Sequence, residues 1–229
     1  ADLTNKDLRG CNLSSALLDH ADLSGSDLSD ANLSNAHLVE ADLSGTNLTN
    51  ANLLGAELTG VELRESILAG AMLRGLELAS PVLAGVNLQG ANLTEANLPG
   101  ANLTDANLAG ADLTFAVIRG ANMRGANMEG ATLVRTSFGM EGGGPGNDYP
   151  SDLTSVNLRN ADLTGAWLPG ANLTNADLTN AVLRHALLRN SIWTGANVEG
   201  VDFRGARVSG GGDWIDFDKT IGEPAYMAG

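Results

Sequence analysis

The chain has 229 residues and a net charge of −14, and aromatic side chains make up only 4% of it. So few aromatic residues would leave an ordinary globular core thin, and the strong negative charge argues against direct binding to nucleic acid. No apolar run approaches the roughly 18 residues of a membrane-spanning helix, so we do not expect an integral membrane protein.

A five-residue repeat organises the sequence. The stretch Ala91 to Leu113, ANLTEANLPGANLTDANLAGADL, repeats Ala-Asn/Asp-Leu-x-x, and the same frame gives 28 repeats up to Phe138 and 12 more from Leu153. On an α-helix, successive Leu residues would drift by roughly 140° and share no face. In a flat strand, an odd period would put them on alternate faces. The period therefore predicts a coil that winds around its own core, with each Leu and the Ala two residues before it pointing inward.

The last two residues of each pentapeptide are predicted to form the corners of this coil. Gly or Asn occupies the final position in most repeats, and Pro99-Gly100 and Pro169-Gly170 fit a type II turn. Such a turn needs positive φ at its third residue, where Gly and Asn are tolerated. Another turn type is expected where this position holds a larger side chain, as at Glu40, Glu65, Glu95 and Phe115.

These repeats resemble the A(D/N)LXX motif of the pentapeptide repeat proteins, and the resemblance covers about positions 1–138 and 151–208. It implies an all-β fold, a right-handed quadrilateral β-helix with four pentapeptides per coil. The repeats then predict about ten coils, with one loop insertion and a C-terminal capping tail. We expect four segments: a β-helix of seven coils (1–138), a Gly/Pro-rich loop (139–150), a β-helix of three coils (151–210) and the tail (211–229).

Residues 1–62 are the acidic part of the chain, with ten Asp and Glu residues against Lys6 and Arg9. A coil of twenty residues would stack one ladder of acids on one face, namely Asp2, Asp22, Asp42 and Glu62. This candidate acidic surface is either a solvated face that keeps the rod soluble or an anionic surface that binds a basic partner or imitates DNA.

Residues 54–88 are less regular. Val61 and Leu76 replace inward Ala, and Pro81 removes a backbone donor at an inward position. Four apolar residues at outward or corner positions are candidates for an interface: Leu54, Ile67, Met72 and Val82. The alternative is a local irregularity that neighbouring side chains pack.

Asn dominates the outward position of the next repeats. Asn87, Asn107 and Asn127 should lie above one another and form a structural amide ladder. The break that follows, 139–150, has the composition of a loop, and its Gly-rich run lacks the strand-to-helix context and the Lys of a phosphate loop. It is either a flexible excursion or a recognition loop that presents Met140 and Tyr149.

The last repeats and the tail carry the second group of candidate interface residues. The outward positions hold Trp167, Val182, Leu187 and Ile192, and the tail adds Trp214. Trp167 and Leu187 are twenty residues apart and should stack, with the other two outward residues on adjoining faces. The last coil presents an open edge, which either the tail or an external partner should cover.

No catalytic constellation emerges from the sequence. A solenoid with a filled Leu core has no interior cleft, and no spacing pairs a nucleophile with a base. Cys11 is most simply a small inward residue, and His20 and His37 lack the third oriented ligand of a metal site. We expect no enzyme, no cofactor and no metal.

Two functional readings follow. The first is a structural scaffold or protein-interaction rod that docks on a larger protein complex, which a membrane could also carry. The long Leu runs are similar to cyanobacterial and chloroplast members of the family, which implies a cyanobacterium. The alternative resembles the quinolone-resistance members, acidic DNA mimics that bind type II topoisomerases, although this tail lacks their amphipathic helix. The compartment is open: the cytoplasm, or the thylakoid lumen or periplasm if an N-terminal signal has been removed.

Overall fold

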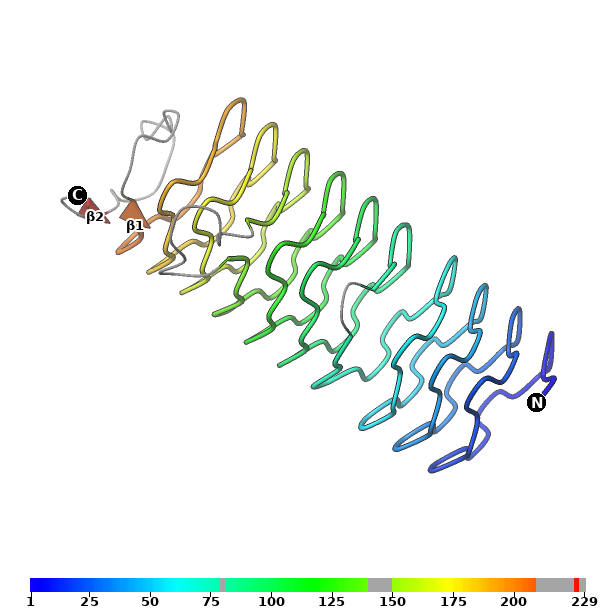
Figure 1. Cartoon of the computed structure of the whole chain (residues 1–229). Helices are drawn as coiled ribbons and strands as arrows, with labels where there is room; N and C mark the ends of the chain where they lie inside the picture. The colour runs from blue at the N-terminus through cyan, green and yellow to red at the C-terminus, as the bar shows by residue number, and fades with distance from the viewer. Residues whose placement is uncertain (79–80, 140–149, 209–224, 227–229) are drawn as a thin grey trace.

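The chain winds as a solenoid from its N-terminus at one end to its C-terminal region at the other (Figure 1). This computed structural model describes residues 1–78, 81–139, 150–208 and 225–226, the last two by their backbone alone. Figure 1 shows the successive turns of the backbone lying side by side along the axis of the rod.

Parallel bridges connect each turn to the next, with one bridged residue in each pentapeptide. The bridge partner lies twenty residues farther on, as for Asp2 with Asp22 and Asn12 with Asn32. Four pentapeptides therefore complete one coil. Corner residues separate the bridges and prevent longer strands, so the named strands among the described residues are only β1 (Arg207–Val208) and β2 (Ala225–Tyr226).

The four ladders of bridged residues define four walls, which we name after their first members. They begin as follows: the Asp2 wall with Asp2, Asp22 and Asp42, the Asp7 wall with Asp7, Asp27 and Asn47, the Asn12 wall with Asn12, Asn32 and Asn52, and the Leu17 wall with Leu17, His37 and Glu57. The walls follow one another in this order around each coil, so the Leu17 wall adjoins the Asp2 wall of the next coil.

The corners share one conformation. The N–H of the inward residue donates to the Leu carbonyl three residues earlier, as from Ala31 to Leu28 at 3.1 Å, and the residue before it has positive φ, as at Gly25 with +66°. Both are features of the predicted type II turn.

The expectation of another turn type at corners with larger side chains was wrong. The φ angles are +55° at Glu40, +57° at Glu65, and +61° at both Glu95 and Phe115. The reason is the ladder: the N–H of Glu40 donates to Thr59 O of the next coil at 2.8 Å, and such bonds hold the corner whatever its side chain prefers.

Leu and Ala fill the interior of the rod. Leu108 and Ala111 are 0% exposed, and full burial of a Leu side chain contributes roughly 1.5–3 kcal/mol. Where Ser or Thr replaces the inward Ala, its hydroxyl donates to a backbone carbonyl. Thr136 Oγ1, for example, donates to Leu113 O at 2.8 Å. Polar groups at these inward positions therefore have partners, and the small Ala side chains let the coils approach.

The ladder step lengthens across the Gly/Pro-rich segment. Asn122 bridges Asp152, thirty residues away instead of twenty, so this coil holds ten additional residues. The N–H of Ser151 donates to Phe138 O at 3.2 Å, the bond that closes an ordinary corner. The extra residues thus enlarge one corner without breaking the wall. The loop residues themselves, Tyr149 among them, lie outside the described residues.

Strand β2 covers the open edge at the end of the Leu17 wall. Arg207 of β1 bridges Leu187 on one side and pairs in parallel with Ala225 on the other. The rest of the tail, including Trp214, lies outside the described residues. Within the described ranges, no helix is long and apolar enough to cross a membrane. The count of ten coils and the segment boundaries stay predictions.

Candidate interaction surfaces

Consecutive coils of the Asp2 wall carry the four acids singled out in the sequence: Asp2, Asp22, Asp42 and Glu62. The fold itself uses an oxygen of these carboxylates in hydrogen bonds at the corners. Asp22 Oδ1 accepts hydrogen bonds from the backbone N–H of Ser24 at 3.0 Å and from its hydroxyl at 2.6 Å. The corresponding backbone and hydroxyl hydrogen bonds from Thr4 lower the pKa of Asp2. One oxygen of such a carboxylate thus caps its own corner, and the ladder is structural as well as anionic.

The four apolar residues predicted within 54–88 do not form one patch. Ile67 lies on the Asp7 wall, Met72 on the Asn12 wall and Val82 on the Asp2 wall, whereas Leu54 occupies a corner. All four are exposed, Val82 the most at 51%. Because three walls face three directions, a single flat partner could not contact all of them.

A cleft of about 460 Å³ opens beside Val82, between two successive coils. Its lining includes Val61, Glu62, Glu77, Leu78, Pro81 and Val82. Among the described residues, the bridges that would join Glu57 to Glu77 and Glu62 to Val82 are missing from their ladders. The sequence signalled the irregularity through Pro81, but it did not show that the coils separate there.

Two residues of the second group, Trp167 and Leu187, come together, whereas the other two lie on walls that face opposite directions. Trp167 and Leu187 bridge each other on the Leu17 wall, while Val182 and Ile192 lie on the adjoining Asn12 and Asp2 walls. Trp167 and Ile192 are exposed, and the other two are half-buried. We call Trp167 and Leu187 the Trp167 patch.

Two further exposed apolar residues were not among the predicted interface residues. Leu17 is 79% exposed at an outward position of the first coil, so its place in the repeat was the signal. Phe115 is 50% exposed at a corner, and the guanidinium carbon of Arg135 lies 5.8 Å from its ring centroid, a cation–π contact. Phe115 and Arg135 are twenty residues apart, and this spacing could have predicted their contact.

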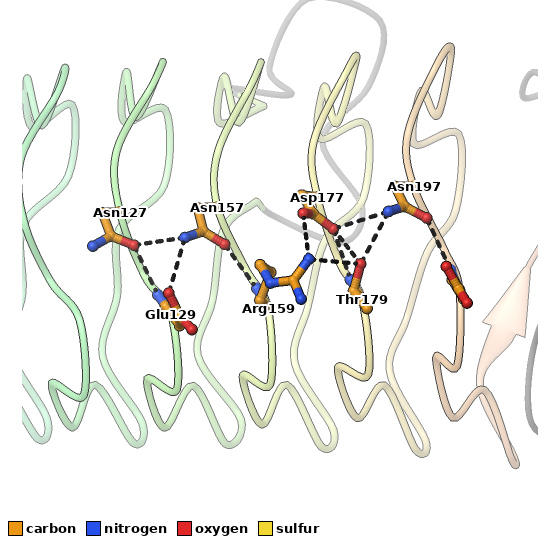
Figure 2. A network of polar contacts seen from close by, with 8 residues as sticks. Asn127, Glu129, Asn157, Arg159, Asp177, Thr179 and Asn197 are labelled. Atoms are coloured by element: carbon orange, nitrogen blue, oxygen red, sulfur yellow. Dashed lines mark hydrogen bonds and ion pairs between the residues drawn. The ribbon is translucent and has the colours of Figure 1, made fainter.

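The predicted amide ladder is confirmed on the Asp7 wall. Asn107 Nδ2 donates to Asn87 Oδ1, and Asn127 Nδ2 donates to Asn107 Oδ1, both at 3.2 Å. Asn157 extends the ladder across the enlarged corner, bonding Asn127 at 2.9 Å. Figure 2 shows that the network then continues from Arg159 to Asp177. Arg159 Nη1 donates to Asp177 Oδ2 at 3.0 Å. Its side chains bond one another, which supports a structural role.

Asp202 is a buried carboxylate on the Asn12 wall, near the end of the solenoid. Its side chain is 7% exposed, and its Oδ2 lies 2.6 Å from Nη2 of Arg204 and 2.5 Å from Nε of Arg184. The hydrogen bonds from Arg204, followed by those from Arg184, hold the pKa of Asp202 far below its usual range, although burial opposes them. We interpret these ion pairs as contacts that join neighbouring coils.

The described residues contain no group of three or more His, Cys, Asp or Glu side chains arranged to hold a metal ion. His20 Nδ1 lies 3.2 Å from Glu40 Oε2, and His37 Nδ1 lies 3.3 Å from Glu57 Oε2. Each pair joins neighbouring coils. Cys11 is a free, half-buried thiol at an inward position.

Comparison with known proteins identifies the family to which the chain belongs. The pentapeptide repeats family matches in eight copies, within residues 1–35, 26–64, 41–76, 82–116, 101–139, 157–192 and 181–211. The curated proteins gave no match. Among solved structures, the chain is similar to HetL, a pentapeptide repeat protein involved in heterocyst differentiation regulation in the cyanobacterium Nostoc sp. strain PCC 7120. Identity is 32% over 90% of this chain and 86% of HetL, with a TM-score of 0.59.

Two further structures superpose more loosely. QnrB1, a plasmid-mediated fluoroquinolone resistance protein, is 17% identical over 89% of this chain and 88% of its own, with a TM-score of 0.39. Rfr23 from the cyanobacterium Cyanothece 51142 is 24% identical over 64% and 91%, with a TM-score of 0.22. The family matches cover most of the chain. Members of this family fold as right-handed quadrilateral β-helices, which agrees with the four bridged pentapeptides per coil. The chain belongs to the pentapeptide repeat family.

Proposed function

We propose that this protein is a non-enzymatic interaction rod that docks on a larger protein complex. The Trp167 patch carries the proposal. The interior of these coils is already filled, and the outward side chain of Trp167 is 37% exposed beside Leu187. Apolar side chains grouped on an otherwise polar surface are typical of protein interfaces, and tryptophan is enriched at interface hot spots.

The family supports this reading. HetL, the solved relative that is 32% identical, is involved in the regulation of heterocyst differentiation in a cyanobacterium. We infer a cyanobacterial setting and a regulatory or scaffolding role from that likeness. We further infer about ten coils in two stretches, 1–138 and 151–210, separated by the loop 139–150 and followed by the tail 211–229.

The described hydroxyl groups support a non-catalytic role. Buried Ser and Thr side chains at inward positions donate to carbonyl oxygens, as Ser191 Oγ does to Leu188 O at 2.7 Å. A hydroxyl engaged in this way is not aligned with a general base, so it lacks what activates a serine nucleophile.

Capture of partners from a cyanobacterial lysate tests the proposal. The immobilised wild-type protein is compared with a variant that carries Trp167→Asp and Leu187→Asp, and bound proteins are quantified by mass spectrometry. We expect the variant to lose a salt-resistant complex, and its thermal unfolding is measured to show that it folds, because Leu187 is half-buried. The matched control is Leu17→Asp, the same kind of change on the same wall at the far end of the rod. Equal capture by the double variant and wild type would exclude the Trp167 patch.

A second candidate function is an acidic DNA mimic that binds a type II topoisomerase. The observation in its favour is the acid ladder of the Asp2 wall, whose members follow one another in consecutive coils. Supercoiling by gyrase at micromolar concentrations of the protein tests it. Inhibition that weakens with Asp22→Asn and Asp42→Asn would favour mimicry, and unaffected supercoiling would eliminate it.

A further inference from the structure

The backbone ladder opens at one step among the described residues, between residues 55–65 and the following coil. At an ordinary step, the N–H of an inward Leu donates to the outward residue of the next coil, as from Leu98 to Val117 O at 2.7 Å. At the equivalent position, the N–H of Leu58 makes no bond to Glu77 O or to any other described group. The same is true of the N–H of Leu63. Two adjacent walls therefore present unpaired backbone groups to the cleft.

The other two walls remain closed at this step. Asn87 N still donates to Ser66 O, but at 3.4 Å, compared with 3.0 Å for the equivalent bond from Asn107 to Val86. Leu53 N donates to Met72 O at 3.1 Å on the opposite side. The two coils thus splay like a wedge, joined on the Asp7 and Asn12 walls and open on the Leu17 and Asp2 walls.

The residues at the inward positions account for the opening. Val61 and Pro81 are twenty residues apart, so two bulky side chains follow each other where most coils have Ala, and Leu76 is a third on the next wall. Val61 and Leu76 are only half-buried, whereas Ala101 is 0% exposed. Pro81 also has no N–H to close its corner onto Leu78 O. The bulk of these inward side chains therefore accounts for the separation of the coils.

The chemistry of the open step resembles the edge of a sheet. One rim offers the N–H groups of Leu58 and Leu63, and the other offers the unpaired carbonyl of Glu77 and the N–H of Val82. Apolar side chains such as Val61 and Leu78 and polar ones such as Thr59 and Asn97 line the space between the rims, which has a volume of about 460 Å³, within the usual range of binding pockets. The Glu77 carboxylate has no partner among the described residues, whereas Glu62 lies 3.3 Å from Arg64.

We propose that the open step binds an extended segment of a partner protein, which adds a strand between the two coils. Both rims carry backbone groups that lack hydrogen-bond partners. A polypeptide backbone supplies donors and acceptors in a regular order and can pair with them. The Glu77 carboxylate and the charge of −14 favour a segment with Lys or Arg beside Val, Ile or Thr. This site is separate from the Trp167 patch, so either proposal can fail without the other.

Selection from a phage-displayed library of random heptapeptides against the full chain tests this proposal. We expect enriched sequences to combine a basic residue with β-branched residues. The best peptide is then synthesised with a fluorophore, and its affinity is measured by polarisation. Methylation of alternate backbone nitrogens should weaken binding by at least about tenfold, because it removes donors and leaves the charge unchanged.

Variants locate the site. Val61→Ala with Pro81→Ala should let the coils close and abolish binding, while thermal unfolding reports whether that variant folds. Glu77→Gln leaves the backbone untouched and should weaken binding about two- to fivefold, unlike Glu199→Gln on a distant coil. The proposal is overturned if no peptide is enriched, if the methylated peptide binds equally well, or if both Glu77→Gln and the double variant bind like wild type. A wild-type dimer in sedimentation that dissociates in the double variant would assign the step to a second copy and also overturn it.

Discussion

A single corner residue in each pentapeptide adopts a left-handed backbone conformation, and its side chain does not decide this. Asn50, Glu95 and Phe115 have φ angles between +57° and +61°. Sequence could predict corners from Gly and Asn, because the preference is local. It could not predict the conformation of Glu95 or Phe115, because there the hydrogen bonds to the next coil overcome the local cost.

A glycine-to-alanine change measures that local cost. Gly110 has a φ of +66°, and an added Cβ would meet no atom within 4 Å, so the backbone conformation alone should determine the effect. We expect Gly110→Ala to lower the free energy of unfolding by about 1 kcal/mol. Ser155→Gly, at a corner with a φ of +58°, should change it in the opposite direction. Urea denaturation measures both, and equal stabilities would show that these corners carry no strain.

The buried Asp202 should make stability depend on pH. Its pKa in the folded chain lies below that in the unfolded chain, about 3.9, so its contribution is present above that pH and is lost as the pH falls further. Asp202→Asn should therefore cost about 1–3 kcal/mol at pH 7, and the difference from wild type should shrink below pH 4.

Asp162→Asn is the control for this change. Asp162 lies on the same wall and bonds Thr164, but it contacts no arginine among the described residues. It should show a smaller loss in the same denaturation series. A pH-independent effect of Asp202→Asn would contradict the assigned role of the carboxylate.

At the scale of the coil, the sequence predicted the features that depend on the five-residue period. The inward Leu and Ala and the stacking of residues twenty apart follow from the repeat alone. The spread of Leu54, Ile67, Met72 and Val82 over different walls also follows from the numbering, but composition suggested a patch where geometry separates them. The opening at Pro81 depends on how successive bulky residues pack, and a one-dimensional pattern does not encode that.

The enlarged corner gives an element-scale prediction. Deletion of residues 141–150 together with Met140→Gly would leave a corner of the ordinary two residues between Phe138 and Ser151. We expect the coil to persist and the free energy of unfolding to change by less than about 2 kcal/mol, because the closing bond from Ser151 to Phe138 is already present. Circular dichroism and thermal unfolding measure this. Loss of cooperative unfolding would mean that the segment is part of the core.

At the scale of the whole molecule, a filled solenoid offers function only on its outside and at interruptions of its ladder. The Trp167 patch is a surface of the first kind, and the sequence predicted it because Trp167 and Leu187 are outward apolar residues twenty positions apart. The open step is of the second kind. Stability in such a rod is a sum over coils and their interfaces, so one weak step divides it into two cooperative blocks.

The central claim is that the backbone ladder is continuous except at the open step. Hydrogen–deuterium exchange at individual amides tests it. The N–H groups of Leu58 and Leu63 have no partner within the described structure, whereas those of the matched residues Leu98 and Leu103 donate at 2.7 Å. We predict that the first pair exchanges much faster than the second and becomes protected when Val61→Ala and Pro81→Ala close the step. Equal protection of all four amides in the wild-type protein would contradict the open step.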